Sequence, residues 1–171
     1  MKYGVVIFPS KSLQDKVNGY RKRYDPHYAL ITPHITLKSP FDAEDQDIQQ
    51  LAEKLRRIAA LHQPFTYHVS KVKSFEPVNN VIYFKVDPNS TLDSLYKEMH
   101  TEDFPGEEPY AFVPHITIGQ QLSNDEHSDV YGSLQMESID LTEKADRFHL
   151  LYQLDNGSWT VYETFLLGKD A

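Results

Sequence analysis

The chain has no cysteine among its 171 residues. This absence excludes disulfide bonds, zinc sites built from thiolates and a cysteine nucleophile within this sequence. It also fits a reducing compartment, because proteins of such compartments carry few disulfides.

Long apolar runs are missing as well. The apolar run near the N-terminus covers only residues 4–8 before Pro9, which is shorter than the apolar region of a secretory signal peptide. No stretch approaches the roughly 18 consecutive apolar residues that indicate a membrane span. The composition, 40% hydrophobic and 25% charged, is that of an ordinary globular protein. We therefore expect a soluble, cytoplasmic protein.

Positive charge is scarce in the second half of the chain, and the net charge is −8. Residues 1–85 carry 13 Lys and Arg against 8 Asp and Glu, whereas residues 86–171 carry 4 against 17. An acidic protein is poorly suited to non-specific binding of long nucleic acids. The basic first half still leaves room for a local anion site.

A short repeat is the most informative feature that the sequence does contain. "TPHITL" begins at Thr32 and "VPHITI" at Val113, so Pro-His-Ile-Thr occurs at both His34 and His115. The preceding residues also correspond, because "YALITPHITL" matches "YAFVPHITI" with one gap. Such a repeat gains weight if its two copies lie on equivalent structural elements.

Apolar periodicity places the copies on equivalent elements, because each follows a strand and a helix. The strand at 3–8 and the helix at 11–24 precede the first copy, and the strand at 81–86 and the helix at 90–100 precede the second. The pattern predicts an α/β fold of the α+β type, with two pseudo-symmetric lobes in a single bilobal domain over 1–171. Each lobe is expected to be a mostly antiparallel sheet flanked by helices, with the active-site cleft between the lobes. The other predicted strands lie at 33–39, 65–75, 110–119, 135–143, 147–155 and 158–168, and the other helices at 42–61, capped by Asp42, and 123–133.

Strand geometry gives the repeated motif a chemical meaning. Residues two apart on a strand point to the same side, so His34 and Thr36 should share one face while the aliphatic residues beside them enter the core. The same holds for His115 and Thr117. Two such strands near a pseudo-two-fold axis would bring two imidazoles and two hydroxyls to one cleft.

These four groups suit the cleavage of a phosphoester. An unperturbed histidine has a pKa near ~6.5, so one imidazole can accept a proton from water while the other donates one to a leaving oxygen. Threonine hydroxyls can donate hydrogen bonds to the non-bridging phosphate oxygens. The set requires neither a metal ion nor a nucleophilic side chain.

With its paired His-x-Thr-aliphatic motifs, the chain resembles the two-histidine (2H) phosphoesterase superfamily, which includes RNA 2′,5′-ligase-like proteins and cyclic phosphodiesterases. Over its whole length it resembles the YjcG-like branch. The resemblance implies a hydrolase without a cofactor, with His34 as proton donor and His115 as proton acceptor. It implies that Thr36 and Thr117 bind the substrate phosphate.

The chain departs from the family pattern after the second motif. Family members that act on RNA often carry Arg or Lys there, whereas this chain has Gly119, Gln120 and Gln121. Lys38 follows the first motif and is expected to share the face of His34, which makes it a candidate phosphate contact. We therefore expect a small phosphoester or nucleotide substrate rather than a long nucleic acid.

Several alternatives remain open at this point. The protein could be an RNA-end processing or ligase-like enzyme, or a nucleotide-binding module that turns nothing over. The two histidines with a third ligand could form a zinc site. The sequence does not indicate the oligomeric state. Aromatic residues flank the motifs and could either stack on a base or pack in the core: Tyr28, Phe41, Tyr110 and Phe112.

Overall fold

The computed structural model describes residues 1–106 and 111–169, which form eight strands and four helices. No helix of this part of the chain is long and apolar enough to cross a membrane. The elements, in chain order, are β1 (Lys2–Ile7), α1 (Lys11–Tyr24), β2 (Ile35–Asp42), α2 (Asp45–Ala60), β3 (Phe65–Ser74), β4 (Ile82–Val86), α3 (Ser90–Glu98), β5 (His115–Gly119), α4 (Asn124–Leu134), β6 (Leu141–Ala145), β7 (Arg147–Gln153) and β8 (Trp159–Leu166).

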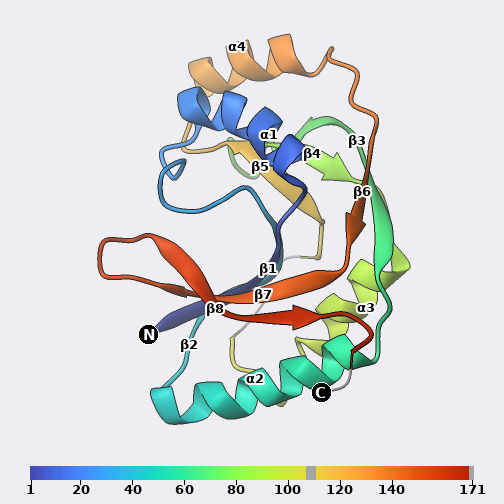
Figure 1. Cartoon of the computed structure of the whole chain (residues 1–171). Coiled ribbons are helices and arrows are strands. Elements are labelled where there is room, and N and C mark those ends of the chain that lie inside the picture. The colour runs from blue at the N-terminus through green and yellow to red at the C-terminus, as the bar shows by residue number, and fades with distance from the viewer. Residues whose placement is uncertain (107–110, 170–171) are drawn as a thin grey trace.

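All eight strands belong to one sheet with the order β6-β3-β4-β5-β2-β1-β7-β8. Every pair of neighbours is antiparallel, which confirms the predicted fold class. The sheet divides into two halves of four strands that meet where β2 pairs with β5 (Figure 1). The register at this junction is given by a single pair, Ile35 with Ile116.

The two halves repeat the same plan. In each, a strand, a helix and a motif strand follow one another, and the motif strand pairs antiparallel with the first strand: β2 with β1, and β5 with β4. The helices are exchanged between the halves, because α1 packs against β5 and α3 packs against β2. Figure 1 shows α1 and α4 at one end of the molecule and α2 and α3 at the other. In the strand order, the motif strands β5 and β2 are the two central strands of the sheet.

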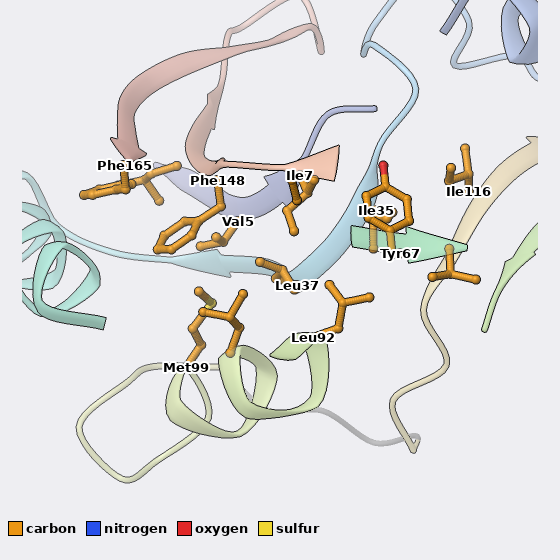
Figure 2. Close-up of a cluster of buried hydrophobic side chains, with 14 of the residues drawn as sticks. Val5, Ile7, Ile35, Leu37, Tyr67, Leu92, Met99, Ile116, Phe148 and Phe165 are labelled. Atoms are coloured by element: carbon orange, nitrogen blue, oxygen red, sulfur yellow. The ribbon is translucent and has the colours of Figure 1, made fainter. Parts of the chain in front are cut away.

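The aliphatic residues of both motifs enter the core as the alternation predicts. Ile35 and Ile116 are 0% exposed, and Leu37 and Ile118 are also buried. Figure 2 shows Leu37 on the side of the strand that faces α3, in the same buried cluster as Leu92 and Met99. Burial of one such side chain contributes about 1.5–3 kcal/mol. This packing fixes which face of β2 and β5 is turned away from the core.

Two motif strands begin later than predicted, and proline is the reason. The strand expected at 33–39 is β2, from Ile35, and the strand expected at 110–119 is β5, from His115. Pro33 and Pro114 stand just before the histidines and have no N–H to donate to a ladder. Residue 110 lies outside the described residues.

Two other predicted boundaries were wrong. Asp42 does not cap α2; it ends β2, where it pairs with Lys2, and Glu44 is the N-cap residue. The strand expected at 135–143 is the shorter β6, from Leu141. The segment just after α4 makes turn hydrogen bonds instead, from Gln135 N to the Tyr131 carbonyl and from Glu137 N to the Leu134 carbonyl.

Candidate active site

The junction of β2 and β5 brings the two motifs together. Because the strands are antiparallel and Ile35 is opposite Ile116, the residues next to this pair also face each other across the junction. His34 is therefore placed opposite Thr117, and Thr36 opposite His115. The cavities agree with this arrangement: His34 and Thr117 line one, and His115 and Thr36 line the other.

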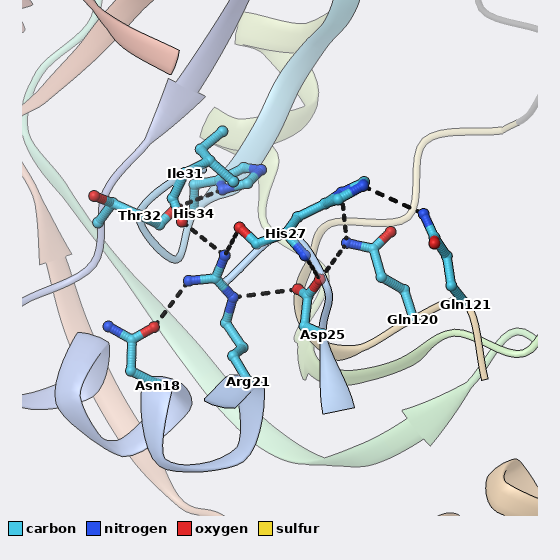
Figure 3. Close-up of polar contacts among 9 residues, drawn as sticks. All are labelled: Asn18, Arg21, Asp25, His27, Ile31, Thr32, His34, Gln120 and Gln121. Carbon is cyan, nitrogen blue, oxygen red and sulfur yellow. Dashed lines mark hydrogen bonds and ion pairs between the residues drawn. The ribbon is translucent and has the colours of Figure 1, made fainter. Parts of the chain in front are cut away.

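Both imidazoles are held in the same way. His34 Nδ1 lies 2.7 Å from the Thr32 carbonyl oxygen, and His115 Nδ1 lies 2.6 Å from the Val113 carbonyl oxygen (Figure 3 for His34). A carbonyl can only accept, so each Nδ1 carries a proton and donates it. Nε2 is then the nitrogen of each ring that can take up a proton or give one up.

The surroundings lower the pKa of both histidines. The pKa of His34 is lowered to about 4, mainly by burial and also by the charges of Arg21 and His115, while the hydrogen bond to Thr32 and the charge of Asp25 oppose the shift. Burial also lowers the pKa of His115, against the hydrogen bond to Val113. Both rings are therefore neutral at pH 7 without a ligand. This corrects the expectation, drawn from the unperturbed pKa, that one would be protonated. A bound anion would favour the protonated form and raise these pKa values.

Two aromatic rings fix the orientation of His115. The Phe75 ring lies 5.0 Å from the imidazole, centroid to centroid, at an interplanar angle of 88°. The Tyr83 ring lies 5.1 Å away at 62°. Edge-to-face contacts of this kind favour this orientation of the imidazole.

A buried arginine organises the loop before His34. Arg21 is 2% exposed, and its Nη2 donates to the Ile31 carbonyl at 2.7 Å (Figure 3). Its Nε lies 3.3 Å from Asp25 Oδ2, and Asp25 Oδ1 accepts from Gln120 Nε2 at 3.0 Å. This network links α1, the loop before the first motif and the residue after the second motif. Removal of either charge would leave the other buried and unpaired, which is strongly destabilising.

Arg21 was not predicted as part of the site, although the sequence carried a signal. It lies four residues after Val17 and eight after Leu13, so it continues the buried stripe of α1. An arginine in such a stripe must have polar partners inside the protein. Arg21 lines the same cavity as His34, so a cation is present beside the motifs although none follows the second one in sequence.

The departure from the family pattern after the second motif has a packing reason. A Cβ at Gly119 would lie 3.0 Å from the Tyr24 Cβ, closer than ordinary contact. The next backbone N–H, of Gln120, donates to the Tyr24 carbonyl at 2.9 Å. Gly119 and Gln120 thus dock the C-terminal end of α1 against β5.

Lys38 lines the same cavity as His34, but its ammonium is directed away from the histidines. A β-bulge interrupts the pairing of β1 with β2, since Val6 faces Thr36 but Val5 faces Lys38. An extra residue disrupts the ladder locally and bends the strand. The Lys38 ammonium lies over the rings of Phe41, at 5.4 Å, and Phe104, at 5.8 Å. A phosphate contact would require the buried side chain to leave this position.

The flanking aromatics divide between core and cavity. Phe112 stacks on Tyr96, with 4.3 Å between ring centroids and an interplanar angle of 10°, and both line the cavity beside His115. Phe41 is buried in the core. The Tyr28 ring lies 5.9 Å from the Arg21 guanidinium carbon, and Tyr110 lies outside the described residues.

The groups around the two histidines determine which chemistry the site can support. Within residues 1–106 and 111–169, no group of three or more His, Asp or Glu side chains is placed to hold a metal ion. The donor set around His34 and His115 is two imidazoles, two hydroxyls and the amides and guanidinium of the adjoining network. Such a set can transfer protons and bind an anion by hydrogen bonds.

Comparisons with known proteins agree with this geometry. The sequence profile of the 2′-5′ RNA ligase superfamily matches residues 9–157. A protein of Bacillus anthracis and one of Bacillus thuringiensis are each 60% identical to this chain over 169 residues, which cover 99% of this chain and 98% of theirs. Both relatives bear the name "Putative phosphoesterase".

Solved structures share the fold at low sequence identity. Escherichia coli LigT complexed with 3′-AMP superimposes with a TM-score of 0.73 at 14% identity, covering 98% of each chain. TT0787 of Thermus thermophilus superimposes with a TM-score of 0.67 at 16% identity, covering 100% of each chain. The matched profile and the full-length relatives show that this chain belongs to the 2′-5′ RNA ligase superfamily, the two-histidine phosphoesterases.

Proposed function

We propose that the protein is a metal-independent phosphoesterase that hydrolyses a small cyclic phosphate or a 2′-linked phosphodiester by acid–base catalysis. One observation carries the proposal. Two imidazoles from equivalent strands each donate Nδ1–H to the carbonyl two residues before them, so each has Nε2 as its reactive nitrogen. The threonine of the other motif lies across the strand junction from each ring.

In this proposal, His115 Nε2 accepts a proton from water as the water oxygen bonds to phosphorus. The opposite P–O bond breaks, and His34 Nε2 donates its proton to the leaving oxygen. Thr36 and Thr117 donate hydrogen bonds to the non-bridging oxygens as negative charge builds there. Proton exchange with solvent then restores both rings.

His34 must be protonated to act as the acid, although its pKa is about 4 in the free protein. Binding of the anionic phosphodiester raises the pKa of His34, because a negative charge beside the ring favours its protonated form. Binding of the substrate and uptake of the proton are therefore coupled. His115, on the other side, is neutral at pH 7 and ready to accept a proton.

The comparisons support a small substrate. LigT structures hold 3′-AMP, ATP, NADP⁺ and phosphate, and the relatives at 60% identity are named for phosphoester chemistry. For this chain we extend the proposal to mononucleotide-sized phosphoesters, because each cavity beside the histidines is about the size of one small molecule: about 380 and about 420 Å³.

The test is hydrolysis, in the presence of EDTA, of adenosine 2′,3′-cyclic phosphate, adenosine 3′,5′-cyclic phosphate and adenylyl-(2′→5′)-adenosine, with products separated by chromatography. We expect turnover of at least one of them, and a fall of about 10²–10⁴ in His34→Ala and in His115→Ala. His68→Ala is the control. His68 lies on β3, forms ion pairs with Asp87 and Asp140, and lines neither cavity.

Other outcomes would favour other functions. Binding of these nucleotides without turnover would make the protein a binding module. Activity that EDTA abolishes and a divalent ion restores would favour a metal enzyme. Normal activity in either histidine variant would contradict the assigned roles.

A further inference from the structure

Two separate cavities flank the histidine pair, and they differ in chemistry. One, of about 380 Å³, touches His115; the other, of about 420 Å³, touches His34. They share Thr36, one of the two proposed phosphate ligands. A phosphate held at Thr36 would therefore have room for a substituent on each side.

The His115 cavity suits a planar, largely apolar group. Its aromatic walls are Phe75 and the stacked pair Tyr96 and Phe112, all partly exposed. Aliphatic side chains complete much of the lining, and Asn79 at the rim offers an amide that can both donate and accept a hydrogen bond. Flat aromatic walls of this kind stack on aromatic rings irrespective of their exact identity.

The His34 cavity is lined by many more polar groups. Gln120, Gln153 and His27 offer donors and acceptors, and Trp159 presents an indole ring. Arg21 also lines it, but its charge is balanced by Asp25. Lys2 and Lys38 line it too, but Lys2 is exposed and the Lys38 ammonium lies over the rings of Phe41 and Phe104. The amides and the indole ring together suit a hydroxyl-rich group such as a polyol or a sugar.

From this asymmetry, and resting on the function proposed above, we propose that the substrate is a linear phosphodiester with an aromatic group on one oxygen and a hydroxyl-rich alcohol on the other. The aromatic group occupies the His115 cavity and the alcohol occupies the His34 cavity. His34, as the proton donor, stands on the side of the alcohol.

The reaction then has a fixed direction. Water, deprotonated by His115, bonds to phosphorus; the bond from phosphorus to the alcohol oxygen breaks; and His34 protonates that oxygen. The products are the free alcohol and a phosphomonoester that keeps the aromatic group. A cyclic mononucleotide has no separate alcohol, so it leaves the His34 cavity unfilled and should be the poorer substrate.

The experiment compares kcat/KM for three probes: adenosine 2′-phosphate esterified with glycerol, adenosine 2′,3′-cyclic phosphate, and bis(glycerol) phosphate. We expect the mixed diester to exceed each of the others by at least about tenfold, and its products to be glycerol and adenosine 2′-phosphate. Release of adenosine with glycerol phosphate would contradict the assignment of the cavities.

Variants separate the two cavities. Gly4 lines the His34 cavity, and a Cβ there would meet only ordinary contacts, 3.5 Å from the Lys38 carbonyl oxygen and 3.9 Å from the Trp159 ring. Gly4→Ala should therefore narrow the cavity without strain, and should lower kcat/KM more for the mixed diester than for the cyclic probe. Phe112→Ala should lower kcat/KM about 5- to 150-fold for both adenosine probes, as expected when a stacking partner is lost, but not for bis(glycerol) phosphate. Asn79→Ala removes an amide at the rim of the same cavity, on an exposed loop, without loss of core packing. It should also lower kcat/KM for both adenosine probes but not for bis(glycerol) phosphate.

The possible failures are distinguishable. If the cyclic probe is turned over as well as the mixed diester, and both depend on His34, the phosphoesterase proposal holds and the two-substituent proposal is wrong. The two-substituent proposal is equally wrong if Gly4→Ala lowers kcat/KM for the mixed and cyclic probes to the same extent. If no probe is hydrolysed, or if turnover does not depend on His34, the proposed function fails and this inference fails with it.

Discussion

Ile35 pairs with Ile116 at the junction of the two halves of the sheet, and both side chains are 0% exposed. This pair sets the positions of the residues on either side of it, so it sets the distance between the two motifs. Ile35 stands between His34 and Thr36, and Ile116 stands between His115 and Thr117. The geometry of the candidate site thus depends on a core contact.

Truncation of this contact should cost stability. Ile116→Ala is expected to lower the free energy of unfolding by about 2–5 kcal/mol, because it leaves a cavity where the surrounding side chains are fully packed. Val161→Ala is the matched control on β8, where Val161 is 42% exposed, and its effect should stay within about 0.5 kcal/mol. Denaturant unfolding measures both values, and equal effects would mean that the junction is not part of the tightly packed core.

The pH dependence of kcat/KM should reflect the lowered pKa values of the two histidines. The active free form has His34 protonated and His115 neutral, and both pKa values lie below 6.5. The population of this form rises as the pH falls below 7, so kcat/KM should reach its maximum on the acidic side of pH 6.5. The maximum of kcat should lie at higher pH, because the bound anion raises the pKa of His34. A kcat/KM maximum above pH 7 would contradict this description.

The same shifts predict how stability depends on pH. Below pH 6.5 the unfolded chain binds protons at these two histidines, whereas the folded protein resists them until the pH approaches about 4 for His34. The two side chains therefore favour unfolding increasingly as the pH falls from 6.5 towards 4. His34→Gln should lose less stability between pH 7 and pH 4.5 than the wild type does. A larger loss in the variant would show that His34 is protonated in the folded state.

Gly119 should not tolerate a side chain. In Gly119→Ala the new Cβ would meet Tyr24 at 3.0 Å, so α1 must shift from β5, and we expect a loss of about 1–3 kcal/mol. Gly19→Ala, on α1 itself, has nothing within 4 Å of the new Cβ, and should raise stability by up to about 1 kcal/mol through helix propensity. Thermal unfolding of the two variants should move Tm in opposite directions. A neutral Gly119→Ala would mean that the contact of α1 with β5 is not tight.

The first motif shows how much of the site could be predicted from the sequence. The alternation of His34, Ile35, Thr36 and Leu37 predicted the faces of β2, because one face of a strand must enter the core. It was a poorer guide one residue later, because a bulge precedes Lys38, which lines the His34 cavity while its ammonium lies over Phe41 and Phe104. A bulge depends on how β1 pairs with β2, and no local pattern in β2 encodes that pairing.

Long-range packing accounts for the other differences. The periodicity of α1 and α3 predicted both helices, but not that each covers the motif strand of the opposite half. The lowered pKa values of His34 and His115 arise from burial and, for His34, also from Arg21, which is 13 residues before it in the sequence. Such effects follow from tertiary contacts, so the unperturbed pKa was a poor guide to the charge of the free site.

The dependence on salt should distinguish a small substrate from a long one. In the His34 cavity Arg21 is paired with Asp25 and the Lys38 ammonium lies over aromatic rings, so few cations are left for phosphates, and the net charge of the chain is −8. For a single strand ending in a 2′,3′-cyclic phosphate, log(kcat/KM) against log[salt] should have a slope of about −0.7, the value for about one phosphate contact. The cyclic mononucleotide should give a similar slope. A much steeper slope with the long strand, together with tighter binding, would favour the RNA-processing function.

His34 is the proton donor of the proposed reaction, and a change of leaving group tests this role directly. The measurement is kcat/KM of the wild type, His34→Ala and His115→Ala on two diesters of adenosine 2′-phosphate, one with glycerol and one with 4-nitrophenol. A glycerol oxygen must be protonated as it leaves, whereas nitrophenolate is stable as an anion. We predict that His34→Ala loses about 10²–10⁴ in kcat/KM with the glycerol diester and less than about tenfold with the nitrophenyl diester, while His115→Ala loses about 10²–10⁴ with both. Equal losses for His34→Ala with the two substrates would contradict its role as the acid.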